Sequence, residues 1–300
     1  MQPIIPLLPQ PSLQYQVGAA LMLVCVTFML FGTLTTQAYF YAHTYKSDHY
    51  ALRIFVAGIW VLEIIHTAFC LHFVYVYFVL DLDDPLELLI IPWSIGGSLL
   101  LELGIIGICQ GFYLLRLWRL SNRNLIVVGI PSILLLAHLA GGFASLAYMP
   151  ILKTWPAFNA HRASQILIYV SLSLSAFVDT QLVVLVIFYL RKHMARFRRS
   201  RGTLQTLTFL TVGTGAITII GSLSVILLFA FMHNSLTYGA MMQIMSKLYG
   251  NSVFGFLNAR QHLRSCMQAD AAESVPVRLT DAQNRSDDKE QVYRSDVYAK

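Results

Sequence analysis

Long runs of apolar residues, separated by short polar stretches, dominate the pattern of this chain. Each of seven runs exceeds the roughly 20 apolar residues that a helix needs to cross a bilayer. The runs are Val17–Tyr41, Leu52–Val79, Pro92–Leu115, Leu125–Ala147, Ser164–Leu190, Gln205–Met232 and Leu236–Leu257. They are continuous and lack the alternation of apolar and polar positions that membrane β-strands show. The pattern therefore predicts an all-α integral membrane protein, a seven-transmembrane-helix bundle.

The positions of Lys and Arg predict how this bundle is oriented. Basic residues occur in alternate connections between the runs, as in Lys46 and Arg53 of the first connection and Arg119 and Arg123 of the third. Because basic connections stay on the cytoplasmic side, we expect the N-terminus outside and the C-terminus cytoplasmic. We also expect the membrane to be the plasma membrane.

Composition agrees with this prediction and excludes other classes. Of the 300 residues, 56% are hydrophobic and 12% are charged, whereas about 25% are charged in soluble domains. The net charge is +6, but the basic residues collect beside apolar runs and do not form a nucleic-acid footprint. The expected surroundings are therefore the lipid bilayer, with no nucleic acid as partner.

The same pattern divides the chain into three regions. Residues 1–16 form a short, proline-punctuated N-terminus, which we expect to be extracellular. Residues 17–264 form the transmembrane domain. Residues 265–300 are polar and charged and bury no core, so we expect a disordered cytoplasmic tail.

The seventh run contains the least ordinary residue of the chain, Lys247. A lone ammonium near the middle of a span costs roughly 2.5–3.5 kcal/mol on insertion scales. Gln243, Lys247 and Asn251 follow one another at intervals of four, so they form one polar stripe on a helix. We expect this stripe to face other helices and not lipid.

Other runs also contain ionisable residues at a similar depth. Glu102, His138, Asp179 and Lys247 all lie within about two residues of the middle of their runs, roughly 3 Å in depth. Glu63 lies about one turn nearer the cytoplasmic side, and His66 shares its helix face. These residues are the candidates for a polar chamber or a buried charge pair: Glu63, His66, Glu102, His138, Asp179, Lys247 and Asn251.

Two interpretations of these residues remain open. Charges at mid-membrane often mark a ligand or ion site. In the second interpretation the charges are structural: Asp179 or a glutamate pairs with Lys247 and holds the helices in register. The Glu63-x-x-His66 spacing resembles that of metal ligands on one helix, but a metal centre needs more such groups. We therefore expect an ordinary contact there, and no metal or cofactor.

The fifth connection carries six basic residues, Arg191, Lys192, Arg196, Arg198, Arg199 and Arg201. They set the topology, and they also suit contact with anionic lipids of the inner leaflet. A third interpretation is docking of a cytosolic signalling protein.

The chain resembles a family of fungal multi-pass membrane proteins, abundant in mushroom-forming species, that share a seven-span domain of unknown function. The resemblance covers about Gln14 to Arg264. Its most specific part is the seventh-run sequence Ser246, Lys247, Leu248, Tyr249, Asn251, Ser252, Leu257, Asn258 and Arg260. It implies that Asp179 and Lys247 belong to an architecture shared within that family, and it implies no activity.

The sequence leaves several functions open. A receptor-like sensor fits seven spans with an outside N-terminus, although the third run ends without an acidic–Arg–aromatic motif and the seventh without an NPxxY motif. A secondary transporter or ion-coupled carrier would use the midplane charges, although we find no internal repeat. A retinal protein would use Lys247, but Gln243 replaces the usual carboxylate and the sixth run lacks Trp and Tyr. We expect no enzyme activity.

Overall fold

The computed structural model describes residues 13–80, 86–196, 201–232 and 237–260. These residues form helices joined by turns, with one isolated bridge between Ile90 and Thr154 and no strand. The labelled elements are α1 (Leu13–Thr44), α2 (Tyr50–Tyr75), a π-helical turn η1 (Val76–Leu80), a 3-10 turn η2 (Glu87–Leu89), α3 (Trp93–Leu120), α4 (Leu125–Leu146), α5 (Met149–Leu152), α6 (Trp155–Ala160), α7 (Arg162–Arg196) and α8 (Arg201–Met232). A further helix spans residues 237–260. The expected N-terminal segment up to residue 12 and the expected tail lie outside the described residues.

Six of the seven expected spans are helices long and apolar enough to cross a membrane, and these six indicate a membrane protein. They comprise α1, α2 with η1, α3, α4 with α5, α7 and α8. The seventh run also forms a long helix, 237–260, but it is not among these six. Its polar residues, such as Gln243, Lys247 and Asn251, lower its mean hydropathy, so length and composition alone identify six spans.

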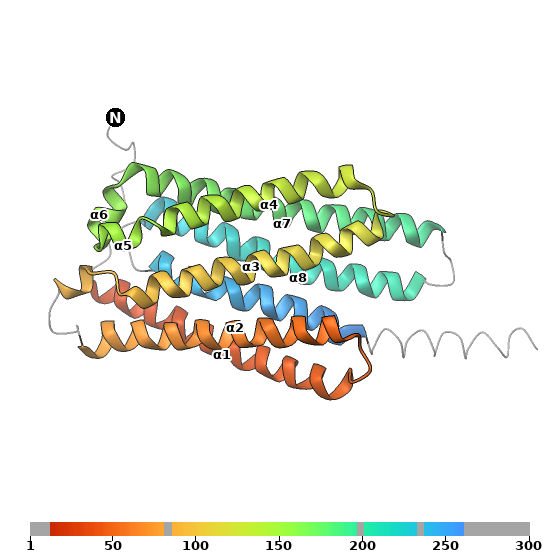
Figure 1. Cartoon of the computed structure of the whole chain (residues 1–300), viewed down its shortest axis with the longest axis horizontal. Helices are drawn as coiled ribbons and strands as arrows, with labels where there is room; N and C mark the ends of the chain where they lie inside the picture. Colours follow the sequence, from red (N-terminus) through yellow and green to blue (C-terminus); the bar gives the residue numbers. More distant parts are fainter. Residues whose placement is uncertain (1–12, 81–85, 197–200, 233–236, 261–300) are drawn as a thin grey trace, which may run out of the picture.

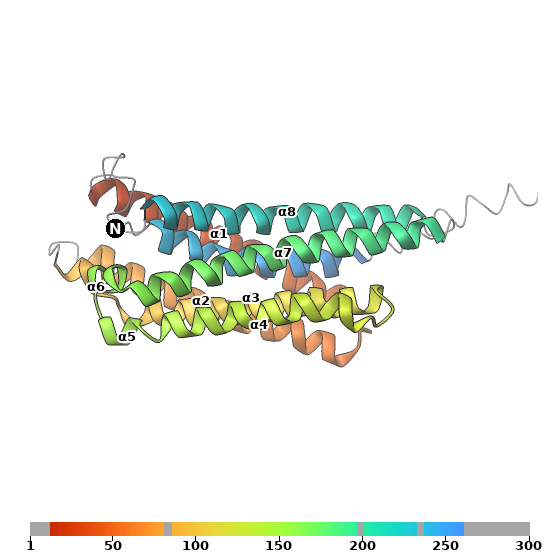
Figure 2. The same cartoon turned by 90° about the horizontal axis from the view of Figure 1, so that it is seen from above.

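The long helices run side by side along the molecule (Figure 1). The turns α1–α2 and α3–α4, the last turn of α7, the first turn of α8 and the end of helix 237–260 lie at one end of the bundle, which we call the basic end. The short elements η2, α5 and α6 lie at the opposite end, which we call the α6 end (Figures 1 and 2). The basic first and third connections and the C-terminal end of α7, which carries Arg191 and Lys192, therefore lie at the same end, as the alternation of charge predicts.

Large apolar side chains cover the outward faces of the helices. Met29 on α1, Ile133 on α4 and Phe209 on α8 are 72%, 68% and 78% exposed. A water-soluble protein rarely exposes so many large apolar groups, whereas a bilayer solvates them. The outer faces therefore match a hydrocarbon environment.

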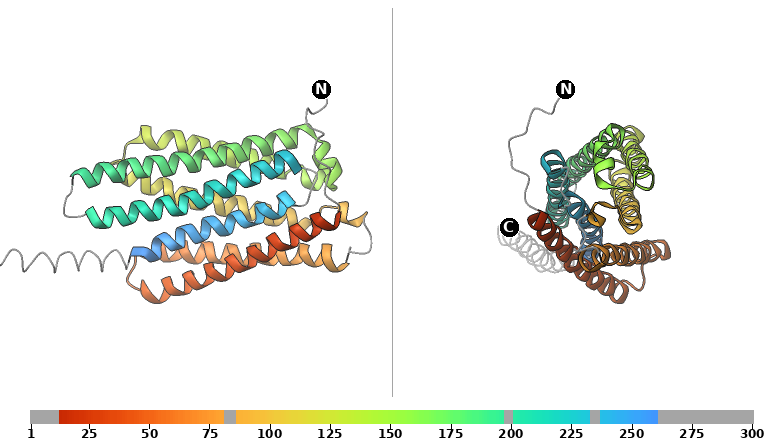
Figure 3. Two further views of the ribbon diagram at one scale, coloured as in Figure 1. Left: turned by 180° about the vertical axis from the view of Figure 1, so that it is seen from behind. Right: turned by 90° about the vertical axis from the view of Figure 1, so that its left-hand side faces the viewer.

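Helix 237–260 is the most enclosed of the long helices. None of its residues is exposed, and Lys247, Val253 and Ser246 have no accessible surface. Figure 3 shows this helix, in blue, between α8 on one side and α1 on the other. A helix buried on all sides has no lipid-facing stripe, and for this reason it accommodates polar residues that a lipid-exposed helix would exclude.

Candidate functional site

The Lys247 side chain lies between helix 237–260 and α2, where the ammonium meets four acceptor atoms. It forms an ion pair with the Glu63 carboxylate, and neither side chain has any exposed surface. It also donates to Oγ1 of Thr67 at 2.9 Å, to Nδ1 of His66 at 3.1 Å and to the Glu63 carbonyl at 3.3 Å. These partners replace the water that a buried ammonium loses.

His66 belongs to the same cluster, because Glu63, His66 and Thr67 share one face of α2. Since an ammonium only donates, Nδ1 of His66 accepts its hydrogen bond, and the ring proton of a neutral His66 lies on Nε2. One turn further along α2, the Cys70 thiol donates to Oε1 of Gln243 at 3.4 Å. Gln243 and Lys247 therefore both face α2.

Of the two pairings considered for Lys247, with Asp179 or with a glutamate, the structure has the pair with Glu63, and no ion pair or hydrogen bond joins Asp179 to Lys247. Asp179 instead accepts hydrogen bonds from the Tyr249 hydroxyl, from Nε2 of Gln110 at 2.9 Å and from Oγ of Ser222 at 3.4 Å. These four residues come from α7, α3, α8 and helix 237–260. Asp179 is thus the acceptor that ties four helices together.

Asn251 lies in the polar stripe but faces α1. Its amide nitrogen donates to the Leu30 carbonyl at 3.0 Å, and its amide oxygen accepts from Oγ1 of Thr33 at 2.8 Å. The stripe expected from the sequence therefore turns from α2 to α1 along its length. Asn251 fixes the packing of helix 237–260 against α1, and it lines neither of the two cavities described below.

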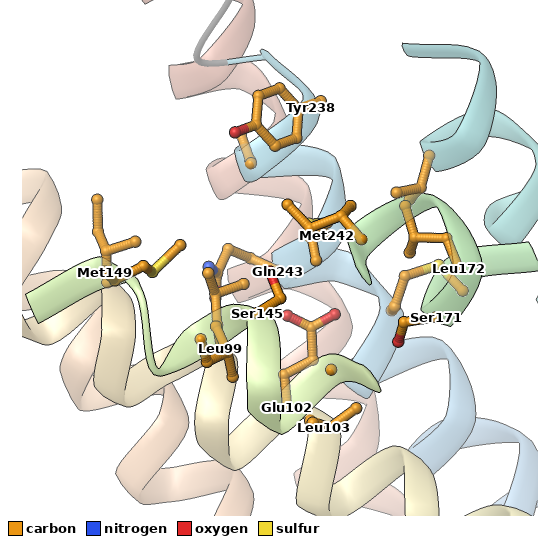
Figure 4. A pocket seen from close by; sticks show the side chains of 18 of the residues that line it. Leu99, Glu102, Leu103, Ser145, Met149, Ser171, Leu172, Tyr238, Met242 and Gln243 are labelled. Carbon is orange, nitrogen blue, oxygen red and sulfur yellow. The ribbon is translucent and has the colours of Figure 1, made fainter. Parts of the chain in front are cut away.

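A cavity of about 130 Å³ lies in the half of the bundle toward the α6 end. It is bounded by α1, α2, α3, α4, α7, α8 and helix 237–260, and it reaches η1, η2, α5 and α6. Its walls are mostly apolar, as Figure 4 shows for Leu99, Leu103 and Met242. The Glu102 carboxylate points into this space from α3 (Figure 4), although the residue is only 4% exposed. We call this space the larger cavity.

His138 on α4 lines the same cavity and is 3% exposed. Its Nδ1 contacts the Ser171 carbonyl at 2.9 Å, and Oγ of Ser171 donates to the His138 carbonyl at 3.0 Å. These reciprocal contacts hold α4 against α7. Because a carbonyl only accepts, Nδ1 of His138 carries the proton in this contact.

A smaller cavity of about 30 Å³ lies toward the basic end, between α3, α7, α8 and helix 237–260. Asp179 and Tyr249 line it, whereas Ser175 and Ser222 line the larger cavity. Gln110 donates weakly to Oγ of Ser175, at 3.5 Å, as well as to Asp179. A polar layer, defined as Gln110, Ser175, Asp179, Ser222 and Tyr249, therefore separates the two cavities.

At the basic end, Arg191 and Lys192 are exposed. Arg198 and Arg199 lie outside the described residues, as do the side chains of Arg196 and Arg201. Arg116 of α3 lies deeper, with its guanidinium 3.9 Å from the centre of the Phe256 ring. The basic end thus presents positive charge both on its surface and between helices.

The candidate residues consequently fall into separate groups. Glu63, His66 and Lys247 form one cluster, Glu102 and His138 share the larger cavity, and Asp179 belongs to the polar layer. Sequence reasoning left Tyr249, Thr67 and Ser222 out of the candidate set. Thr67 carried a signal, because it lies four residues after Glu63 and therefore on the same helix face. Tyr249 carried another, because it belongs to the most specific part of the family resemblance. Ser222 resembles an ordinary helix residue in sequence.

Within the part of the chain that the structure describes, no group of three or more His, Cys, Asp or Glu residues could hold a metal ion. Residues 175–262 match a family of unknown function, DUF6534. This stretch includes Asp179, Lys247, Tyr249 and Asn251, so a domain of unknown function is confirmed there. No curated protein and no solved structure matches the chain.

Proposed function

We propose that this protein is a receptor-like sensor of the plasma membrane that binds a small molecule in the larger cavity. In this proposal helix 237–260 is the seventh span, the N-terminus is outside and the basic end is cytoplasmic. We further propose that the resemblance to the fungal seven-span family extends over Gln14–Arg264. The protein would act by binding, without a catalytic step.

The placement of the two cavities carries this proposal. The larger cavity lies toward the α6 end, the smaller one toward the basic end, and the polar layer lies between them. Ser175 and Ser222 touch both the larger cavity and hydrogen-bond partners of the layer. A ligand that moves Ser222 would alter a hydrogen bond of Asp179, and one that moves Ser175 would alter a hydrogen bond of Gln110, which itself donates to Asp179. The hydrogen bonds of Asp179 join α7 to α3, α8 and helix 237–260.

The charges of the basic end support a cytosolic signalling partner for the proposed sensor. Arg191 and Lys192 are exposed at the end of α7, close in sequence to four further basic residues. Since α7 and α8 both contribute to the polar layer, a change there would reach the connection between these helices. A cytosolic signalling protein with an acidic docking surface would recognise this connection.

Capture of a G-protein α subunit tests the sensor proposal. Protein in lipid nanodiscs would be incubated with the purified subunit, with and without a non-hydrolysable GTP analogue. A matched variant would replace the six basic residues of the fifth connection by glutamine. Retention that is lost with the analogue and with the variant supports a sensor. Equal retention by both proteins would mean that the fifth connection is not the docking site.

A carrier is the second candidate, because two cavities separated by a polar layer also suit alternating access to a buried site. Proteoliposomes loaded with a pH-sensitive dye distinguish the two functions. Proton or solute flux that stops when Asp179→Asn alters the layer would support the carrier. If the protein shows neither capture of the subunit nor flux, both proposals are contradicted.

A further inference from the structure

Glu102 differs from the other two buried carboxylates of the membrane core. Glu63 has the Lys247 ammonium as its partner, and Asp179 has three hydrogen-bond donors. Glu102 has no hydrogen bond and no ion pair within the described residues, and its Oε2 atom is buried without a partner. Burying a carboxyl group without a hydrogen-bond partner is costly, so a partner that the described residues do not supply would stabilise Glu102.

His138 supplies a second acceptor to the same cavity. Its Nδ1 is committed as a donor to the Ser171 carbonyl, so Nε2 of the neutral ring is an acceptor. This Nε2 atom is also buried without a hydrogen-bond partner in the described part of the chain. Glu102 and His138, each with an unpartnered acceptor atom, thus line one cavity, and a group with several N–H or O–H donors would complement both residues.

The remaining walls restrict the rest of the ligand. Trp155, Phe158 and Tyr238 line the part of the cavity toward the α6 end, and their rings contact one another. Aromatic faces attract cations as well as apolar groups. The volume of about 130 Å³ is similar to that of an engineered cavity, about 150 Å³, that takes up benzene. The occupant is therefore about the size of one aromatic ring with a short side chain.

The nearest charges leave Glu102 available. Glu63 and Lys247 both interact electrostatically with Glu102. However, the Lys247 ammonium is already held by Glu63, Thr67 and His66. A ligand cation at Glu102 would therefore not compete with Lys247 for this carboxyl group.

We propose that the larger cavity binds a small lipophilic amine, whose ammonium group pairs with Glu102 and whose apolar part fills the space lined by Leu99, Leu103 and Met242. This inference rests on the proposed function, because it names the class of ligand for the same cavity. A primary ammonium has three donors, which matches a carboxylate and an imidazole acceptor better than one hydroxyl does.

The test compares an amine with its neutral analogue. Fluorine NMR would follow para-fluorophenethylamine and para-fluorophenethyl alcohol at neutral pH, with protein in phosphatidylcholine nanodiscs and empty nanodiscs as the reference for lipid-dissolved probe. The variants are Glu102→Gln, which keeps the side-chain shape, and Met242→Trp, which fills the cavity. Glu87→Gln is the control, because Glu87 is exposed in η2 and does not line the cavity.

We expect the amine to bind wild type and Glu87→Gln equally, Glu102→Gln roughly tenfold more weakly or worse, and Met242→Trp not at all. The alcohol should bind Glu102→Gln as well as wild type, which also shows that the variant keeps an intact cavity. Equal binding of the amine to wild type and Glu102→Gln would overturn the amine inference and leave the sensor proposal standing. Binding of neither probe to wild type, or binding unaffected by Met242→Trp, would contradict the cavity as a ligand site altogether.

Discussion

Lys247 and Glu63 form an ion pair in which neither side chain has any exposed surface. Oγ of Ser246 also donates to the Glu63 carboxylate, at 3.4 Å, and Thr67 and His66 accept from the ammonium. Such a pair adds little stability compared with well-packed apolar residues, but the loss of one partner leaves a buried charge. The pair therefore fixes the register of helix 237–260 against α2.

Lys247→Met should destabilise the protein strongly, because it leaves Glu63 buried without a cation. The expected loss is about 3–5 kcal/mol in the free energy of unfolding. Adding Glu63→Gln to the same chain should restore most of the thermal stability. Thermal unfolding of both variants in nanodiscs measures this, and a Lys247→Met single variant as stable as wild type would contradict the buried pair.

Asp179→Asn serves as the comparison for that experiment. Asp179 has no contact with Lys247 and is held by Tyr249, Gln110 and Ser222. Asp179→Asn should therefore fail to restore the stability of Lys247→Met, and the two losses should add. A rescue would indicate that Lys247 pairs with Asp179 in the membrane.

Tyr249→Phe should weaken the polar layer, because it removes one donor to Asp179. A hydrogen bond of this kind contributes about 1–3 kcal/mol, and the melting temperature should fall accordingly. Tyr238→Phe is the matched control, since the Tyr238 hydroxyl is buried without a hydrogen-bond partner in the described residues. Equal effects of the two variants would contradict the hydrogen bond to Asp179.

Gly250→Ala should destabilise the protein at the contact of helix 237–260 with α1 and α2. A Cβ at this position would lie 2.5 Å from Cδ1 of Leu34 and 3.2 Å from Oε1 of Glu63. Overpacking of this kind costs about 1–3 kcal/mol. Gly255→Ala has open space around the new Cβ and should be neutral or stabilising by about 0.5–1 kcal/mol. Equal changes in the melting temperatures of Gly250→Ala and Gly255→Ala, measured in nanodiscs, would contradict this packing.

Arg260→Gln should have a small effect despite its ion pair with Asp48 at 2.5 Å. The two side chains are 26% and 12% exposed, so water reaches this pair and weakens it relative to a fully buried one. Asp48 would also keep its hydrogen bond from the Tyr41 hydroxyl, at 2.9 Å. A loss as large as that of Lys247→Met, measured by the same thermal unfolding, would show that this pair is more important than its exposure indicates.

The sequence predicts the helices from the lengths of the apolar runs. It also predicts which connections lie at the same end of the bundle, from the positions of basic residues. It also predicts the burial of Lys247, since an ammonium at that depth cannot face lipid. The partner of Lys247 could not be predicted from depth alone. The long side chain of lysine reaches about one turn along the bundle, so Glu63 and Asp179 were both within range.

The direction in which each side chain points is the other part that the sequence does not specify. Lys247 and Tyr249 are two residues apart, which places them on nearly opposite sides of the helix. Lys247 consequently faces α2, whereas Tyr249 faces α3 and α7. Similar depth suggested a single polar chamber, but the rotation of each helix separates Glu63, Glu102 and Asp179 into three surroundings.

The most direct test measures from which side of the membrane a thiol reagent reaches each cavity. Met242→Cys in the larger cavity and Thr214→Cys in the smaller one would be introduced after Cys25 and Cys266 are replaced by serine, since Cys70 and Cys109 are buried. A membrane-impermeant thiol reagent would then be applied to either side of oriented vesicles. We predict that Met242→Cys reacts from the outside, more slowly when phenethylamine is present, and that Thr214→Cys reacts only from the cytoplasmic side. Reaction of Met242→Cys only from the cytoplasmic side, or at a rate that the amine leaves unchanged, would contradict the account.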